Sequence, residues 1–162
     1  MYRLIAALAL AIFSGASFEA GAQENKACGL ATAAELEGAG GGKVSGLHGN
    51  TVGDMQVCTG TSERATVLLR IASGADSSQE AAAQGVEQLR SMGAQIDVKT
   101  FGPVTCSTVV PPKKMEAYGF NTTCTVRKGD SVAGIEINTK SQADMVPIEK
   151  LRSLAEKMAG RF

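Results

Sequence analysis

Residues 37–46, EGAGGGKVSG, have the glycine-rich composition of a loop that binds phosphate. A P-loop requires G-x-x-x-x-G-K-[S/T], so that backbone N–H groups surround the phosphates and a hydroxyl reaches magnesium. When Gly42 and Lys43 are placed on that pattern, its first glycine falls on Glu37 and its hydroxyl on Val44. A dinucleotide fingerprint also fails, because its third glycine would fall on Lys43. We therefore interpret the run as a helix exit and a connector.

A hydrolytic triad would depend on His48, the single histidine. It lies in GLHGN, a predicted loop in which a solvated histidine is common, and Ser45 and Asp54 are near it only in sequence. A pair of carboxylates, as in glycosidases, is the other catalytic arrangement. The chain has no Trp, two Tyr and five Phe, too few aromatic residues for a good sugar-binding cleft. We assign no catalytic residue and expect a non-enzyme, with a small cell-envelope hydrolase using His48 or a carboxylate pair as the alternative.

The sequence indicates neither a metal site nor a cofactor. Its cysteines form no C-x-x-C pair of the kind that binds zinc, and there is no D-x-D spacing for a calcium loop. An even number of cysteines in an exported chain instead indicates disulfides. We expect no metal, no cofactor and two structural disulfides among the four cysteines, Cys28, Cys58, Cys106 and Cys124.

The first residues predict export. MYRLIAALALAIF has a positive charge before an apolar run over residues 4–13, and Ala20 and Ala22 occupy the small-residue positions of a cleavage site. The run is too short to span a bilayer. We predict a signal peptide over residues 1–22 and a single secreted α+β domain over residues 23–162, located in the periplasm or outside the cell.

The charge balance limits the possible partners. The chain has 16 basic and 16 acidic residues and no basic block, so we expect no nucleic-acid binding. No second long apolar run follows the signal peptide, so we expect no stable membrane span after cleavage. The expected partner is an unknown protein or a cell-envelope ligand.

Three helices are predicted after the signal peptide. The first opens at a capping box of Thr32 and Glu35, and the second opens at a box of Ser77 and Glu80 and stops at Gly93. The second helix has a narrow apolar stripe, formed by Ala82, Val86 and Leu89. The third begins near Pro147 and has a wider stripe that suits a sheet face, formed by Ile148, Leu151, Leu154, Ala155 and Met158.

Strands are predicted over residues 43–49, 54–60 and 64–72, and further strands follow the second helix. In the second half, the two-residue loop Gly129-Asp130 fixes a hairpin register that pairs Lys128 with Ser131 and Cys124 with Ile135. The same alternation in the strand before it pairs Val104 with Val126, Val110 with Phe120, and Cys106 with Cys124. This register predicts a Cys106–Cys124 disulfide and leaves Cys28 for Cys58. The order of elements indicates an α+β fold, an antiparallel β-sheet covered by helices and stapled by two disulfides.

These segments resemble a known group of proteins. CGLATAAELEGAGGGKVSG, VCTG and DMVPIEKLRSLAEKMAGRF are similar to small secreted proteins and lipoproteins of unknown function that are common in actinobacteria. The layout also resembles the extracytoplasmic sensor domains of some bacterial serine/threonine kinases. The resemblance implies a fold and a compartment, and it supplies no catalytic residues. Cys28 lacks the apolar lead-in of a lipoprotein signal, so we expect no lipid anchor.

Residues 111–120, PPKKMEAYGF, join the two strands that carry Cys106 and Cys124. Two prolines stiffen the start of this segment, two lysines give it a local positive charge, and its Met and Tyr are of the kind enriched at interfaces. The other interpretation is a solvated hairpin loop whose tyrosine folds back onto the sheet. We hypothesise a non-enzymatic extracytoplasmic binding or sensing module of unknown ligand, with a partner surface led by Lys113, Lys114, Met115 and Tyr118.

Overall fold

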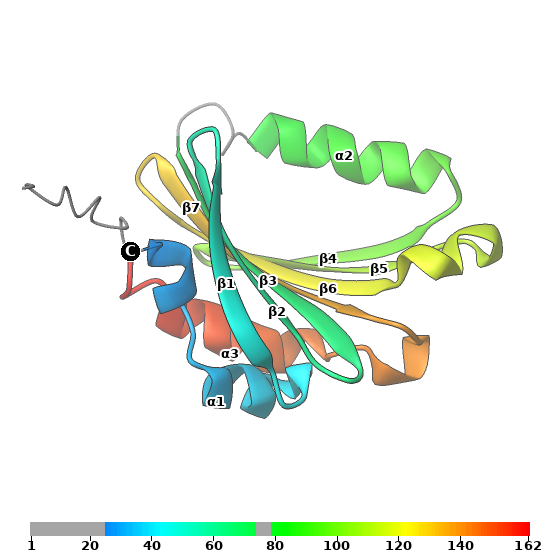
Figure 1. The fold of residues 1–162 in the computed structure, drawn as a ribbon. Helices are drawn as coiled ribbons and strands as arrows, with labels where there is room; N and C mark the ends of the chain where they lie inside the picture. The colour runs from blue at the N-terminus through cyan, green and yellow to red at the C-terminus, as the bar shows by residue number, and fades with distance from the viewer. Residues whose placement is uncertain (1–24, 74–78) are drawn as a thin grey trace, which may run out of the picture.

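A computed structural model describes residues 25–73 and 79–162 of the 162-residue chain. These residues form a seven-stranded antiparallel sheet in the order β1-β2-β3-β7-β6-β5-β4 (Figure 1). The predicted signal peptide and the predicted capping box at Ser77 lie outside the described residues. The strands are β1 (Ser45–Val52), β2 (Met55–Thr61), β3 (Ala65–Ser73), β4 (Gln95–Phe101), β5 (Val104–Val110), β6 (Phe120–Lys128) and β7 (Ser131–Thr139).

Helices lie on both sides of the sheet, with α1 (Ala33–Leu36) and α3 (Ile148–Met158) on one side and α2 (Gln79–Ser91) on the other (Figure 1). The predicted fold class is therefore confirmed, including the two disulfides. Within the described ranges, none of the helices has the length and apolar character needed to cross a membrane. The remaining helical turns are short: η1 (Lys26–Gly29), η2 (Glu37–Gly41), η4 (Lys113–Tyr118) and η5 (Gln142–Asp144).

The core lies between one face of the sheet and the side that carries α1 and α3. Alternate residues of the central strands are fully buried there, including Leu69 and Ile135. All five residues of the predicted apolar stripe of α3 are buried in the same cluster, so that prediction is confirmed. Truncating one such side chain to alanine typically costs about 2–5 kcal/mol, which makes α3 a firmly held element.

The predicted strand register of the second half forms across β6 and β7. The register predicted for β5 and β6 also forms, and it places Cys106 opposite Cys124. The predicted pairing of Val110 with Phe120 is wrong. The β5–β6 ladder ends one pair earlier, at Val109 and Asn121, while Val110 pairs with Gln95 of β4 and Phe120 pairs with Thr139 of β7.

The first strand runs from Ser45 to Val52, so it begins and ends later than the strand predicted over residues 43–49, and like that strand it contains His48. The prediction of a loop at GLHGN is wrong, because His48 lies within β1 and pairs with Thr59 of β2. The glycine that suggested a loop belongs to a β-bulge. The register shifts between Ser45 and His48, and Gly46 takes a φ of 62°.

Helix α2 ends where the sequence predicts. The N–H of Ala94 donates to the carbonyl of Leu89, the N–H of Gly93 donates to that of Arg90, and Gly93 has a φ of 93°. This is a Schellman ending, which favours glycine at the left-handed position. In the predicted stripe of α2, Val86 and Leu89 are only half-buried, and the neighbouring residues 83–85 and 87–88 are exposed. The described part of α2 therefore adds little to the core.

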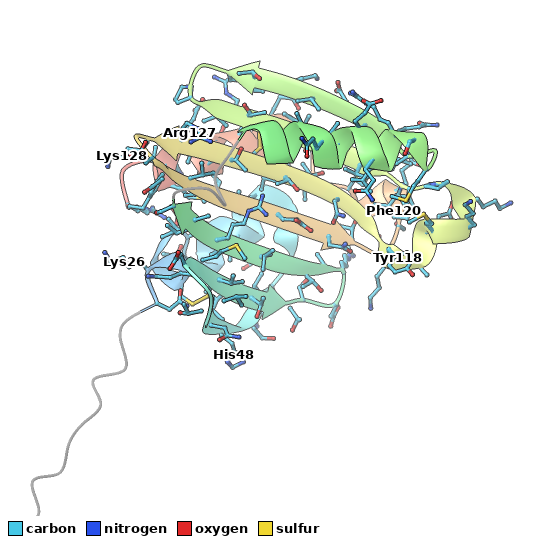
Figure 2. The ribbon with its side chains drawn as sticks, turned by 90° about the horizontal axis from the view of Figure 1, so that it is seen from above. Lys26, His48, Tyr118, Phe120, Arg127 and Lys128 are labelled. Atoms are coloured by element: carbon cyan, nitrogen blue, oxygen red, sulfur yellow. A yellow bond between two sulfur atoms is a disulfide. The ribbon has the colours of Figure 1, made fainter. Side chains whose placement is uncertain are left out.

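The face of the sheet turned towards α2 is mostly polar, and we call it the polar face. Its residues alternate along each strand with the buried residues of the core, and most of them are half-buried. Figure 2 shows this face from above, with α2 over the half of the sheet formed by β4, β5 and β6. On the central strands and β5 the polar face includes Leu68, Arg70, Thr105, Ser107, Val109, Asn121, Thr123, Thr125, Gly134, Glu136 and Asn138.

Candidate functional site

The two predicted disulfides both form. Cys28 of η1 is bonded to Cys58 of β2, and Cys106 of β5 is bonded to Cys124 of β6. All four cysteines are therefore bonded, and none is a free thiol. The second bridge crosses the two strands that lead into and out of residues 111–119, so this segment starts and ends on covalently linked strands.

Residues 111–119 form a compact turn whose centre is η4. The N–H of Met115 donates to the carbonyl of Pro112 at 2.7 Å, and the N–H of Gly119 donates to that of Glu116 at 2.9 Å. The side-chain amide of Asn138 on β7 donates to the carbonyl of Tyr118 at 3.0 Å, which fixes the end of the turn to the sheet. The Tyr118 side chain does not fold back onto the sheet, because the residue is 74% exposed. The alternative interpretation of Tyr118 is thus wrong.

A pocket of about 110 Å³ lies between this turn, the C-terminal end of α2 and the polar face. The pocket brings Met115 and Tyr118, two of the predicted partner residues, next to Leu89 and Met92. Met92 is 40% exposed, so apolar surface continues from the pocket to the outside of the molecule. Apolar walls with few polar groups are typical of small binding sites.

Asn121 is a polar residue in the wall of this mostly apolar pocket. The side chain of Asn121 on β6 contributes to its wall, and its Oδ1 atom is buried and accepts no hydrogen bond from the described residues. A buried acceptor without a donor costs about 1–3 kcal/mol. Asn121 therefore leaves an unsatisfied acceptor beside the pocket.

The predicted lysines lie beside the pocket and not in it. Lys113 and Lys114 begin η4, are exposed, and form no ion pair with any described residue. Glu116 follows them on the same turn and is also exposed, so the segment carries one net positive charge. Exposed charges at the rim of a site act mainly on the association rate and on partner choice.

His48 lies away from this pocket, at the β1 edge of the sheet, whereas Tyr118 lies at the end of the sheet where β6 begins (Figure 2). Its side chain is exposed and lies over Gly46, where an added Cβ would meet His48 Nε2 at 3.0 Å. The hydroxyl of Ser45 donates to the carbonyl of Thr61 instead of to the imidazole. Among the described residues, no hydroxyl or carboxylate is hydrogen-bonded to His48, so they assemble no triad around it.

Two carboxylates do share a neighbour at the surface. Asp97 and Glu149 lie 3.7 Å and 3.8 Å from Nζ of Lys99. Both acids are well exposed, so this is a solvated ion-pair cluster and not a desolvated carboxylate pair of the kind that glycosidases use. Over the ranges that the structure covers, no group of three or more His, Cys, Asp or Glu residues could hold a metal ion.

The glycine-rich run is a helix exit, as predicted. The chain continues from α1 into η2 and leaves it through Gly40 and Gly42, with φ of 104° and 73°. Gly41 also lies close to the sheet, since an added Cβ would meet Cγ2 of Val67 on β3 at 3.3 Å. The adjoining hollow is broad and open, about 760 Å³, and its lining balances two cationic residues with two glutamates. These glycines therefore have a structural role.

The centre of the polar face holds a charged cluster that sequence reasoning missed. Arg70 of β3 and Glu136 of β7 are both half-buried, on the two strands at the middle of the sheet. Burial raises the pKa of Glu136, and the nearby charge of Arg70 partly offsets that rise. In the sequence, a charge within each of LLRIA and GIEIN was the available signal, but the pairing of the two strands could not be inferred.

Comparison of the chain with protein-family models, with curated proteins and with solved structures found no match.

Proposed function

We propose that this protein is a non-enzymatic binding module that works outside the cytoplasm, in the periplasm or beyond the cell. Its docking surface is the turn at residues 111–119 together with the pocket beside it. The observation that carries the proposal is the buried, unpartnered Asn121 acceptor in the wall of an apolar pocket next to an exposed tyrosine. Two disulfides support the compartment, because such bonds persist in oxidising environments.

The chemistry of the pocket supports one class of partner. A volume of about 110 Å³ suits one aliphatic side chain of a partner protein. Burying such a side chain contributes about 1.5–3 kcal/mol. Asn121 would accept a hydrogen bond from a backbone N–H beside this anchor residue. Lys113 and Lys114 favour acidic residues next to the anchor. The partner segment is therefore an acidic peptide with one aliphatic anchor.

Several contacts hold the surface in place before anything binds. The Cys106–Cys124 disulfide links the strands beneath the turn, and the Asn138 amide holds its end at Tyr118. Pro111 and Pro112 fix backbone angles at its start. A site that is already ordered loses less conformational entropy when it binds, which favours affinity from a small surface.

Peptide selection tests the partner chemistry. Random peptides displayed on phage are panned on the oxidised mature protein, and the enriched sequences should combine an aliphatic residue with flanking Asp or Glu. The affinity of a selected peptide is then measured by calorimetry. Met115→Ala combined with Tyr118→Ala should weaken binding at least tenfold, a loss of about 1.4 kcal/mol. Lys113→Ala with Lys114→Ala should slow association and reduce its salt dependence.

The matched control is Val52→Ala. Val52 is also a large exposed hydrophobic residue, 58% exposed, but it lies on β1 at the other edge of the sheet. Binding should be unchanged in this variant. Selected peptides without acidic or aliphatic preference, or equal loss of binding in Val52→Ala and in the Met115/Tyr118 variant, would contradict the proposal.

A further inference from the structure

The charged cluster at the centre of the polar face has a defined geometry. In the β3–β7 ladder Arg70 pairs with Gly134 and Leu68 pairs with Glu136, so Arg70 and Glu136 are diagonal neighbours on one face. Diagonal neighbours in an antiparallel pair are about 7–8 Å apart, within reach of long side chains. The two charges therefore lie close together without being directly opposite.

Gly134 provides the space in which the Arg70 side chain lies. A Cβ added at position 134 would meet Nε of Arg70 at 2.9 Å, its Cγ at 3.2 Å and the Cγ2 atom of Thr125 at 3.4 Å. Arg70 therefore lies flat across β7 towards β6 instead of extending into solvent. Any side chain at position 134 would displace the Arg70 side chain. The glycine therefore leaves the room that the guanidinium group needs to lie over the sheet.

The two charges are close but unpaired. In the described part of the chain, no carboxylate lies within ion-pair distance of Arg70, and no cation lies within that distance of Glu136. Their effect on each other is a longer-range electrostatic one, in which Arg70 lowers the pKa of Glu136. Half-buried charges without partners cost stability, and groups of this kind are concentrated at functional sites.

Hydroxyl groups flank the pair. Thr123 lies opposite Glu136, and Ser107 lies opposite Thr123 on the next strand. Neither hydroxyl is hydrogen-bonded to a described residue, whereas Thr125 next to Arg70 already donates to the carbonyl of Thr105 at 3.3 Å. Thr123 and Ser107 therefore leave hydrogen-bonding capacity on the Glu136 side of the cluster.

We infer that Arg70 and Glu136 bind a small zwitterion, an amino acid or a compound with the same two groups, with its carboxylate on Arg70 and its ammonium on Glu136. A simple anion would be attracted by Arg70 but repelled by Glu136, and a simple cation would meet the reverse. A ligand that carries both charges satisfies both groups, and it can hydrogen-bond to Thr123. This inference does not depend on the peptide pocket at residues 111–119.

The test is an NMR titration of the ¹⁵N-labelled, oxidised mature protein. The probes are glycine, β-alanine, 4-aminobutyrate and 6-aminohexanoate, which separate the same two charges by increasing lengths. Acetate and methylammonium at matched concentrations are the single-charge controls. One chain length should bind best and shift the amides of Thr123, Thr125 and Gly134, while each single-charge control should bind at least tenfold more weakly.

Single substitutions test whether Arg70 and Glu136 each contribute to binding. Arg70→Gln and Glu136→Gln should each reduce the affinity for the best zwitterion at least tenfold, with spectra that remain those of a folded protein. Arg64→Gln and Glu149→Gln change exposed residues elsewhere on the protein. Both variants should bind the best zwitterion with unchanged affinity. The Met115/Tyr118 double alanine variant should also bind normally, which separates this site from the pocket. Absence of shifts on the polar face at about 10 mM of every probe, or equal binding of acetate or methylammonium, would overturn the inference.

Discussion

Glu35 and Arg161 join the two ends of the described chain through paired hydrogen bonds. The two guanidinium nitrogens Nη1 and Nη2 donate to Oε2 and Oε1 of Glu35, each at 2.7 Å. Nη1 also donates to the carbonyl of Leu30 at 2.8 Å. Glu35 is at the same time the acidic member of the predicted capping box with Thr32, which the structure confirms. One carboxylate therefore fixes the start of α1 and the chain that follows α3.

We predict that Glu35→Gln lowers the stability of the protein at neutral pH. The hydrogen bond from Arg161, and then the one from the backbone N–H of Thr32, lower the pKa of Glu35 from 4.5 to about 2. The carboxyl is about one-fifth exposed, so solvent screens part of this effect, and we expect a loss of about 1–2 kcal/mol. Chemical denaturation at pH 7 measures it. The exposed Arg152–Glu156 pair provides the control, since Glu156→Gln should change stability by less than about 0.5 kcal/mol.

The contact between Glu35 and Arg161 should also make the free energy of unfolding depend on pH. A carboxyl whose pKa is lower in the folded state stabilises the fold above its unfolded pKa, and this contribution is lost as pH falls from about 4.5 to about 2. In that window wild type should lose stability faster than Glu35→Gln, and the two curves should converge near pH 2. Parallel curves for the two proteins would show that Glu35 does not carry this dependence.

Glu136→Gln should have the opposite effect and stabilise the protein at pH 7. The pKa of Glu136 is raised above 4.5 by burial, so the folded state binds the proton more tightly than the unfolded state. Wild type therefore loses stability as pH rises above 4.5. The Glu136→Gln variant does not, because the side-chain amide that replaces the carboxyl does not titrate. The difference in Tm between variant and wild type should be small at pH 4 and grow towards pH 7. If Glu136→Gln is less stable than wild type at pH 7, favourable interactions of the carboxylate outweigh the cost of its burial, and the prediction is wrong.

The sequence predicts most of the fold because period-two alternation and a two-residue turn determine strand register. A slip of one residue between β6 and β7 would turn their apolar side chains away from the core, and this restriction extends through β5 to the Cys106–Cys124 bridge. The loop interpretation of GLHGN is wrong because glycines mark both loops and β-bulges, and the register of β1 shifts between Ser45 and His48. The Arg70–Glu136 cluster could not be predicted, because it depends on β3 pairing with β7 and not with a strand near it in sequence. The structure places Met115 and Tyr118, two of the residues predicted to bind a partner, in one pocket, where Leu89, Met92 and Asn121 join them only through the tertiary fold.

We predict that Gly119→Ala destabilises the protein and also weakens peptide binding. Gly119 has φ 87° and ψ 175°, a backbone conformation that side chains rarely adopt and that costs about 1–3 kcal/mol for other residues. An added Cβ would also overlap Oδ1 of Asn138, whose amide holds the carbonyl of Tyr118. The mutation should therefore release the end of the turn that forms one wall of the pocket. Thermal unfolding and calorimetry with a selected peptide measure the two effects.

Gly129→Ala is the control that separates backbone conformation from the contact with Asn138. Gly129 also has a positive φ, 59°, but an added Cβ there would meet nothing within 4 Å. This substitution should cost about 1 kcal/mol from the left-handed backbone alone and leave peptide binding intact. Combining Gly119→Ala with Asn138→Ala removes the overlap, but it also removes the amide that holds Tyr118, so binding should stay weak while part of the stability returns. If Gly119→Ala costs no more than Gly129→Ala and binds the peptide normally, the Asn138 contact does not shape the pocket.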